Sequence, residues 1–350
     1  MRTFYSTGKI PYQTLIDTVF KHLGVKSDRL IVGPAIGEDA AIIAIGKKAI
    51  VVTTDPVTGA LENMGWISVH VNANDVATRG VRPQWYLCSI LLPEKCRKNM
   101  LENIMRQIDR AAKELRVTVV RGHTEITPGL TRPLVIGFMI GETEKGRYVT
   151  SHGADPGDVI VLTKEAGLEG TAILATDLAH VLRKGIDEKV LIAARRFVRR
   201  ISVVKDSQVA MSTGGVKAMH DVTEGGIVSG VWELAEASKC GCVIDGSKIP
   251  LAPETETICR YLKIDPLKVM SSGALLMAVR PNKANAILSN LNKAGVRATS
   301  IGKMVSLRKG RVIVQKNGKV MRLTPPRRDH LYIALEKFGG QVSLLPISHL

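Results

Sequence analysis

The sequence is poor in aromatic residues and has no long apolar run. Phe, Trp and Tyr make up only 4% of the 350 residues, so few rings are present to stack on nucleic-acid bases. No apolar run reaches the roughly 20 residues that a bilayer-spanning helix needs. Residues 1–6 also lack the apolar core of a signal peptide. We therefore expect no membrane association, and we do not expect nucleic acid as a main partner.

Cysteine is scarce as well, and its spacing shows no repeated pairing. The chain has five cysteines, an odd number that does not suit a framework of disulfides. This usage predicts a reduced, cytoplasmic protein. The close pair Cys240 and Cys242 is interpreted as buried strand residues rather than as part of a metal site.

Basic residues, in contrast, are in excess. The chain carries 49 Lys and Arg against 32 Asp and Glu, a net charge of +17. Such a charge suits nucleic acid, but also polyanionic small molecules such as nucleotides. The densest runs are only pairs of arginines, at 195–196, 199–200 and 327–328. Because the excess is so diffuse, it does not indicate a dedicated nucleic-acid surface.

Length and hydrophobic patterning together predict two α/β domains. A chain of 350 residues exceeds what one compact core usually holds, and apolar runs of strand length alternate with segments of helical period. The helices are expected at 12–23, 63–78, 98–115, 171–182, 191–198 and 226–237, and the strands at 49–54, 85–92, 117–121, 134–140, 159–163 and 273–279. A hairpin is expected at 311–320, on the Asn317-Gly318 turn. The polar stretch 141–147 places the boundary near residue 148, between domains at 1–147 and 148–350.

Five short polar segments beside these elements carry most of the candidate chemistry. They are Gly37-Glu38-Asp39-Ala40-Ala41, Thr53-Thr54-Asp55-Pro56, Asn74-Asp75-Val76-Ala77, Arg121-Gly122-His123-Thr124-Glu125, and His220-Asp221-Val222-Thr223-Glu224-Gly225-Gly226. Magnesium prefers oxygen ligands and takes one or two carboxylates together with phosphate oxygens. Several aspartates in such segments therefore suit a magnesium–nucleotide complex.

Each segment also has a purely structural interpretation. Asp39 and Asp55 can cap or start turns. Asp75 lies four residues before Arg79 and can form an ion pair with it on one helix face. Asp221 can cap the helix that follows it. Only the set as a whole favours function over structure.

Several of these segments, followed by Ser271-Ser272-Gly273-Ala274-Leu275-Leu276, occur in the order typical of one family. On them the sequence resembles the AIR synthase superfamily, which also holds thiamine-monophosphate kinase, selenophosphate synthetase and HypE-type hydrogenase-maturation proteins. The HypE type is the most similar. The resemblance implies a two-domain α/β fold with mixed sheets, and a homodimer whose N-terminal sheets join into a barrel. It also implies ATP and Mg²⁺ bound near that interface.

The resemblance implies roles residue by residue. Asp39, Asp55, Asp75 and Asp221 resemble the metal and phosphate ligands, with Asp75 and Asp221 assigned to catalysis. The residues implied to contact the nucleotide are Asp39, Asp55, Asn74, His123, Glu125, Thr223, Gly225 and Gly226. Lys9 is a candidate because relatives cover the site with an N-terminal arm. The segment 164–171 is either a backbone anion site or a plain helix start.

Departures from the family patterns bear on the type of reaction. Residues 346–350 contain no cysteine, which the HypE type uses at its extreme C-terminus, and residues 1–30 contain none of the kind found in selenophosphate synthetases. Glu224 replaces the second aspartate of a standard thiamine-monophosphate kinase, which is a milder change.

We therefore expect ATP-dependent phosphoryl transfer to a small-molecule oxygen, or its activation for a later ring closure or dehydration. Such reactions rest on positioning and charge neutralisation. Two alternatives remain open. One is a HypE-like maturation partner or scaffold that acts through another protein, and the other is a basic nucleic-acid-associated protein on the same fold.

Overall fold

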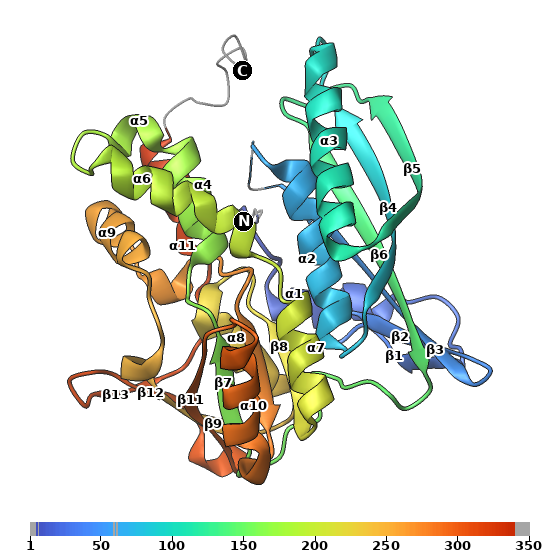
Figure 1. The fold of residues 1–350 in the computed structure, drawn as a ribbon, viewed down its shortest axis with the longest axis vertical. Coiled ribbons are helices and arrows are strands. Elements are labelled where there is room, and N and C mark those ends of the chain that lie inside the picture. The colour runs from blue at the N-terminus through green and yellow to red at the C-terminus, as the bar shows by residue number, and fades with distance from the viewer. Residues whose placement is uncertain (1–4, 6, 59, 61, 340–350) are drawn as a thin grey trace.

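The computed structural model describes residues 5, 7–58, 60 and 62–339. The cysteine-free residues 346–350 and most of residues 1–6 lie outside this part, so the expectations that rest on them stay as stated. Two mixed sheets, each with its own helices, form two halves that lie side by side (Figure 1). This is the two-domain α/β architecture that was expected. The position of the boundary near residue 148 stays a prediction.

The N-terminal half is built on a six-stranded sheet. Its spatial order is β1 (Leu30–Val32), β2 (Ala41–Ile45), β3 (Lys48–Val57), β6 (Leu134–Glu144), β4 (Pro83–Leu92) and β5 (Thr118–Ile126). Only the β4–β5 pair is parallel. Both β1 and β5 are sheet edges in the part of the chain that the structure describes, so no closed barrel is formed there. The short helices α1 (Tyr12–Asp17) and η1 (Val19–Lys21) precede this sheet.

Two helices of this half, α2 (Met64–Thr78) and α3 (Lys98–Leu115), run along one side of the sheet (Figure 1). Every residue of α2 is buried, as its composition predicts, because a helix without a polar face must be covered on all sides. Helix α3 is amphipathic and buries only Ile104, Ile108, Ala111 and Ala112. Helix α2 therefore lies between its own sheet and the C-terminal half.

The C-terminal half contains a seven-stranded sheet. Its spatial order is β13 (Val320–Arg322), β12 (Arg311–Val314), β9 (Gly241–Asp245), β11 (Ala298–Val305), β7 (Val159–Thr163), β10 (Leu275–Val279) and β8 (Val216–Asp221). Strand β10 is buried at all five positions. The helices of this half are α4 (Leu168–Asp177), α5 (Ala179–Leu182), α6 (Glu188–Arg195), η2 (Arg196–Arg200), α7 (Val204–Thr213), α8 (Gly226–Ala237), η3 (Gly246–Lys248), α9 (Pro253–Leu262), η4 (Pro266–Lys268), α10 (Pro281–Lys293), η5 (Leu307–Lys309) and α11 (His330–Phe338).

The expected elements are largely confirmed, with three corrections. Helices 98–115 and 226–237 match, and the 311–320 hairpin forms on the Asn-Gly turn. The helix predicted at 12–23 is too long, since α1 ends at Asp17. The polar stretch 141–147 is not a linker over its whole length, because β6 continues to Glu144 and pairs with β3 up to that residue. Residues 121–125 do not follow a strand but lie within β5.

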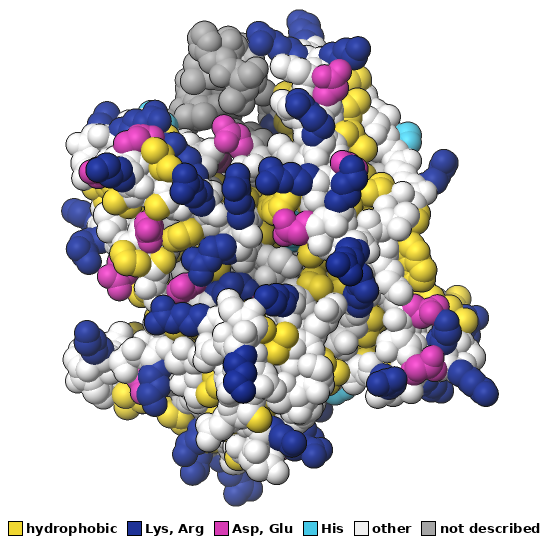
Figure 2. All heavy atoms as spheres, viewed as in Figure 1, with side chains coloured by type: hydrophobic (Ala, Val, Ile, Leu, Met, Phe, Trp, Pro, Cys, Tyr) yellow, Lys and Arg dark blue, Asp and Glu magenta, His cyan; other side chains and the backbone are white. Residues whose placement is uncertain are grey.

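Surface and core features agree with the composition. In the described ranges, no helix is both long enough and apolar enough to cross a bilayer. Basic side chains are spread over the whole face seen in Figure 2 rather than gathered in one patch. Cys242 lies in β9 and Cys240 directly precedes it; both are buried and free, which confirms them as core residues.

Candidate functional site

The four aspartates selected from the sequence come together where the two halves meet. Asp39 precedes β2, Asp55 lies in β3, Asp75 lies in α2 and Asp221 ends β8. Burial raises the pKa of Asp75 well above its usual range, and the charges of Asp55, Asp221 and Asp39 raise it further. Negative charges raise the pKa of a carboxyl group in this way only when they lie close to it, so the four aspartates share one site. Their roles in binding stay predictions.

A glycine allows the Asp39 loop to reach this position. Gly37 has a φ of +79°, and a Cβ there would lie 2.8 Å from the backbone oxygen of Glu233 in α8. Only glycine combines that left-handed conformation with so close an approach. The turn directs Glu38 and Asp39 toward the junction between the halves.

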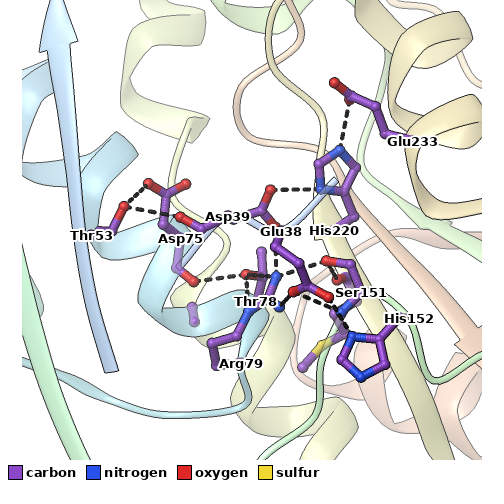
Figure 3. Close-up of polar contacts among 12 residues, drawn as sticks. Glu38, Asp39, Thr53, Asp75, Thr78, Arg79, Ser151, His152, His220 and Glu233 are labelled. Atoms are coloured by element: carbon purple, nitrogen blue, oxygen red, sulfur yellow. Dashed lines mark hydrogen bonds and ion pairs between the residues drawn. The ribbon is translucent and has the colours of Figure 1, made fainter. Parts of the chain in front are cut away.

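A fully buried arginine holds the two acids of this loop. Arg79 Nη2 lies 2.9 Å from Asp39 Oδ2 and donates to Ser151 Oγ at 2.8 Å, while Nη1 pairs with Glu38 (Figure 3). Ser151 belongs to the segment that leads into the C-terminal half. The proposed Asp75–Arg79 ion pair is therefore wrong, because Arg79 is committed to other partners.

His220 lies between two carboxylates beside the aspartates. Its Nδ1 is 2.7 Å from Asp39 Oδ1, and its Nε2 is 2.8 Å from Glu233 Oε2 (Figure 3). Burial alone would lower the pKa of His220, but Asp39 and Glu233 outweigh burial and raise it to about 10. The ring is thus a buried imidazolium, and Asp39, His220 and Glu233 form a charged triad.

This triad predicts a pH-dependent stability. The folded-state pKa of His220 lies above its unfolded value of about 6.5, so its contribution is complete below that value and is lost as the pH rises toward about 10. We expect His220→Gln to lower the free energy of unfolding by about 3 kcal/mol near pH 6. The deficit should shrink as the pH rises, because neutral His220 in the wild type no longer compensates the two carboxylates.

Urea unfolding of both proteins between pH 6 and 10 measures this difference. His152→Gln is the matched control, since His152 also contacts a carboxylate, that of Glu38, but its side chain is 55% exposed. A deficit in His220→Gln that does not change with pH would contradict the assignment of a buried cation.

In the described part of the chain, one group of side chains has the spacing of metal ligands. Ligand atoms of Asp39, His220 and Asp221 lie within 4.8 Å of one another. Both oxygens of Asp39 are already paired, with His220 and Arg79, whereas Asp221 Oδ2 is buried without a hydrogen-bond partner. Such an orphaned oxygen requires an explanation, and a hard cation supplies one. Asp221 is therefore the acid of this group with an oxygen left for a cation, and Asp55 and Asp75 lie near enough for their charges to act on the cluster.

The protonation of these acids agrees with a site built for positive charge. Burial raises the pKa of Asp55 to about 6, with Lys9 lowering it and Asp39 raising it. Burial raises the pKa of Asp221 to about 8, and Asp39 adds to the effect. A divalent cation among them would remove the repulsion and release the protons. The residues thus fit Mg²⁺.

Several residues expected to contact a nucleotide have other roles. Asn74 donates to the Ile201 oxygen and accepts from the Val203 N–H, both at 2.8 Å. Gly225 donates its N–H to Asp329. Gly226 has a φ of +64°, and a Cβ there would lie 2.5 Å from the Leu267 oxygen. These contacts within the protein shape the site, and the expected nucleotide contacts of these residues stay predictions.

His123 and Glu125 are not brought to the aspartates within one chain. They lie on the exposed edge strand β5 and contact each other, with His123 Nε2 at 2.9 Å from Glu125 Oε2. Strands β4 and β6 separate β5 from β3, the strand of Asp55, which amounts to three strand spacings of about 4.8 Å.

Lys9 reaches the acidic cluster from the N-terminal segment. Its Nζ lies 3.6 Å from Glu233 Oε1 and 3.4 Å from Thr223 Oγ1. Glu233 raises the pKa of Lys9 most strongly, and Asp55 contributes. Tyr12 fastens the segment by donating to Glu233 at 2.7 Å and stacking on Trp232. Sequence reasoning missed Glu233, and the available signal was a carboxylate inside the apolar run 227–234.

The segment 164–171 is a plain helix start. Helix α4 begins after Gly167, whose N–H donates to Ser271 Oγ at 2.7 Å, and the Gly170 N–H donates to the Met270 oxygen. These N–H groups are therefore not available to an anion.

Comparison with protein families explains this arrangement. Residues 37–143 match the N-terminal domain of AIR synthase related proteins, and residues 155–315 match the C-terminal domain. The chain belongs to the AIR synthase related family. Both family domains are present in the order that the motifs predicted.

Relatives of this AIR synthase related protein include proteins named for hydrogenase formation and for carbamoyl dehydration. It is 29% identical to a putative hydrogenase expression/formation protein of Methanocaldococcus jannaschii, over 87% of this chain and 91% of the relative. It is 27% identical to the carbamoyl dehydratase HypE of Rhodobacter capsulatus, over 86% of each chain.

Solved structures share the fold. A HypE–HypF complex contains a chain that superposes with a TM-score of 0.73 at 22% identity, covering 89% of this chain and 99% of that one. ThiL complexed with AMPPCP and TMP superposes with a TM-score of 0.70 at 23% sequence identity, covering 93% of this chain and 99% of that one. Another matching structure is HypE in complex with ATP, with a TM-score of 0.69, 22% identity, and coverage of 92% and 98%. At these identities the likeness establishes the fold alone.

Proposed function

We propose that this protein binds ATP with Mg²⁺ at the junction of its two halves and transfers a phosphoryl group to an oxygen of a small molecule. The transfer is either a kinase reaction or an activation step for a following ring closure or dehydration. One observation carries the proposal: Asp39 and Asp221, from the two halves, bring their carboxylates together, Asp55 and Asp75 act on them through their charges, and the Asp221 Oδ2 atom is buried and unpartnered. The relatives solved with ATP and with AMPPCP support the choice of nucleotide.

The chain's own residues have separable tasks in this reaction. Asp55, Asp75 and Asp221 would hold Mg²⁺, which would supply positive charge to neutralise the phosphates. Lys9 would add a mobile positive charge on the side of Glu233 and Thr223. His220 and Arg79 keep Asp39 ionised, since together they lower its pKa against the effect of burial. Positioning and charge neutralisation suffice for phosphoryl transfer without a covalent nucleophile.

Binding of ATP should therefore require magnesium. Without a metal ion the carboxylates repel the triphosphate, so we expect at least about 100-fold weaker binding with a chelator than with magnesium. Affinity should also increase between pH 6 and 9, because the pKa values of Asp55 and Asp221, about 6 and 8, require protons to leave before the metal binds. Calorimetry with ATP measures both effects. Equal affinity with magnesium and with chelator would reject the proposal.

A screen for ADP release with nucleosides and cofactor precursors then identifies the acceptor. It also separates this proposal from a second candidate, a HypE-like maturation partner or scaffold. That candidate is favoured by the relative solved as a HypE–HypF complex. A scaffold binds its protein partner without turning over ATP. All five cysteines are free and four of them are buried, which agrees with our placing the protein in the reducing cytoplasm.

We further expect a homodimer through the N-terminal sheet. All nine residues of β5 are exposed, and they include Val119, Val120 and Ile126. An uncovered apolar edge strand is a template for pairing with another chain, and pairing of two such sheets would form the expected barrel. Light scattering at micromolar concentration should give twice the 38.0 kDa chain mass, and Val120→Lys should give the monomer. A wild-type monomer that retains ATP turnover would exclude the dimeric arrangement.

A further inference from the structure

A groove lies between helix α8 and the hairpin of β12 and β13, outside the cluster of aspartates. Figure 1 shows this hairpin projecting from one side of the C-terminal half. The groove has a volume of about 390 Å³, which falls within the range of roughly 300–1,000 Å³ for clefts that bind ligands. The side chains that line it are one tryptophan, three aliphatic residues and two arginines: Trp232, Leu307, Val312, Leu323, Arg311 and Arg322. The groove therefore combines apolar walls with two cations.

Contacts within the protein hold part of this lining in place. Arg311 donates from Nε to the Cys240 oxygen at 3.0 Å and pairs through Nη1 with Glu236. Its guanidinium carbon lies 5.3 Å from the centre of the Trp232 ring. The other contact of that ring is with Tyr12, on which it stacks with 5.1 Å between ring centroids. Because these side chains are already ordered, binding in the groove does not have to order them.

Leu307 and Arg322 form the open rim of the groove. Leu307 is 53% exposed, and Arg322 is also exposed. Glu236 compensates the charge of Arg311, but the described residues that line the groove include no acid. Tryptophan and arginine are the residues most often found at the centre of protein–protein contacts. The lining is therefore of the kind that receives an apolar side chain with a negative charge beside it.

The chain around the groove is without acids over a long stretch. Residues 266–328 contain 14 of the 49 Lys and Arg and none of the 32 Asp and Glu. This stretch therefore carries +14 of the net charge of +17, and the other 287 residues carry +3. Nine of the 14 cations lie in residues 303–328, which include the end of β11, η5 and the hairpin. The basic excess thus arises from one stretch without acids rather than from dense runs of cations.

We propose that this groove is the docking surface for an acidic segment of a partner protein. The segment has one large apolar side chain, which enters the groove and packs against Trp232 and Leu323. Carboxylates on both sides of that side chain pair with Arg322 and with the basic side chains of the hairpin. The positive potential of residues 266–328 steers such a partner to the surface. The proposal does not depend on the nucleotide site.

Other occupants complement this surface less well. Nucleic acid supplies negative charge but no aliphatic anchor, and a groove with a single aromatic ring gives it little stacking. A second copy of the chain is repelled by its own net charge of +17. Residues 340–350 of the same chain contain no Asp or Glu. An acidic protein segment with an apolar anchor matches both the lining and the charge.

Fluorescence anisotropy with the full-length protein tests this surface. The probe is a fluorescein-labelled peptide, Glu-Asp-Glu-Leu-Phe-Glu-Asp-Glu, and the comparison peptide has serine in place of Leu and Phe. We expect saturable binding of the probe at about 50 mM salt, and about 10-fold weaker binding at about 300 mM salt, where charges are screened. The comparison peptide should also bind about 10-fold more weakly, because it buries no apolar side chain.

Two substitutions at the rim locate the binding. Arg322→Glu and Leu307→Ser should each weaken probe binding by about 5-fold or more. Both residues are exposed, so the melting temperature should stay near that of wild type. Arg260→Glu and Ile192→Ser are the matched controls and should bind the probe as wild type does. The Arg260 side chain is 80% exposed on α9, and Ile192 is 44% exposed on α6.

Several results would overturn the proposal. One is a lack of saturable probe binding, and another is equal affinity for the two peptides or for wild type and both rim variants. Tighter binding of a labelled oligo-dT of about 12 nucleotides than of the probe would assign the surface to nucleic acid instead. A lower mass for Leu307→Ser than for wild type in light scattering would assign the groove to a second copy of the chain.

Discussion

Replacing Asp75 or Asp221 with Asn should lower ATP turnover by about 100-fold or more while leaving the protein folded. Loss of a negative charge that binds the metal removes several kcal/mol of transition-state stabilisation. Asn has nearly the same shape, so no cavity is left. Asp75 and Asp221 come from different halves of the molecule, and neither caps a helix, since the N-cap of α8 is Gly225 and no side chain caps that helix. Local structure therefore does not depend on their charge.

The melting temperature of the Asp75→Asn and Asp221→Asn variants should stay level or rise, although their ATP turnover falls. An acid whose folded-state pKa is raised costs stability once it ionises, and both aspartates have raised values. Without metal at neutral pH, the two variants should thus melt at or above the wild-type temperature. The measurement is ADP release beside thermal melting, with Asp265→Asn as the control outside the cluster. Near-wild-type turnover in both variants would remove these residues from the site.

Arg79→Met should be the most destabilising single change at the junction. The substitution fills most of the volume but leaves Glu38 and Asp39 buried without their cation. Breaking a buried ion pair from one side costs about 3–5 kcal/mol. Arg183→Met is a matched control, because Arg183 pairs with Glu188 where both side chains are about half exposed, and such pairs contribute about 0–1 kcal/mol. Urea unfolding compares the two, and equal losses would contradict the role of Arg79.

The site could be predicted from sequence where function depends on local motifs. Asp39, Asp55, Asp75 and Asp221 each lie in a short polar segment beside a strand or helix, and that context is visible in the chain. Their convergence was inferred only through the order of the motifs, because it depends on how two sheets pack. Strand β3 extends past its apolar core to Val57, since backbone pairing with β6 continues regardless of side-chain type.

The residues that sequence reasoning missed are those whose role comes from tertiary contacts. Glu233 lies inside a helix whose other residues are mostly apolar. The neighbouring sequence does not distinguish a buried acid that pairs with His220 from an acid that is exposed to solvent. Conversely, His123 lies in a segment that matches the family, yet the position of β5 at the sheet edge separates it from the aspartates of its own chain. Whether such a residue lies in the site can be decided only from how the two sheets pack.

Helix α2 has a consequence for how ligands enter and leave. Along its length it is tied to the C-terminal half by Trp66, which donates to the Val198 oxygen at 2.9 Å, by Asn74, and by its Ala77 oxygen, which accepts from Ser207 at 2.6 Å. The helix that carries Asp75 is therefore fixed to the C-terminal half along its length rather than at one end. If nucleotide binds as we propose, we expect it to enter past the segment that holds Lys9 and Tyr12, and we expect release of Tyr12 from Trp232 to limit the rate of product release.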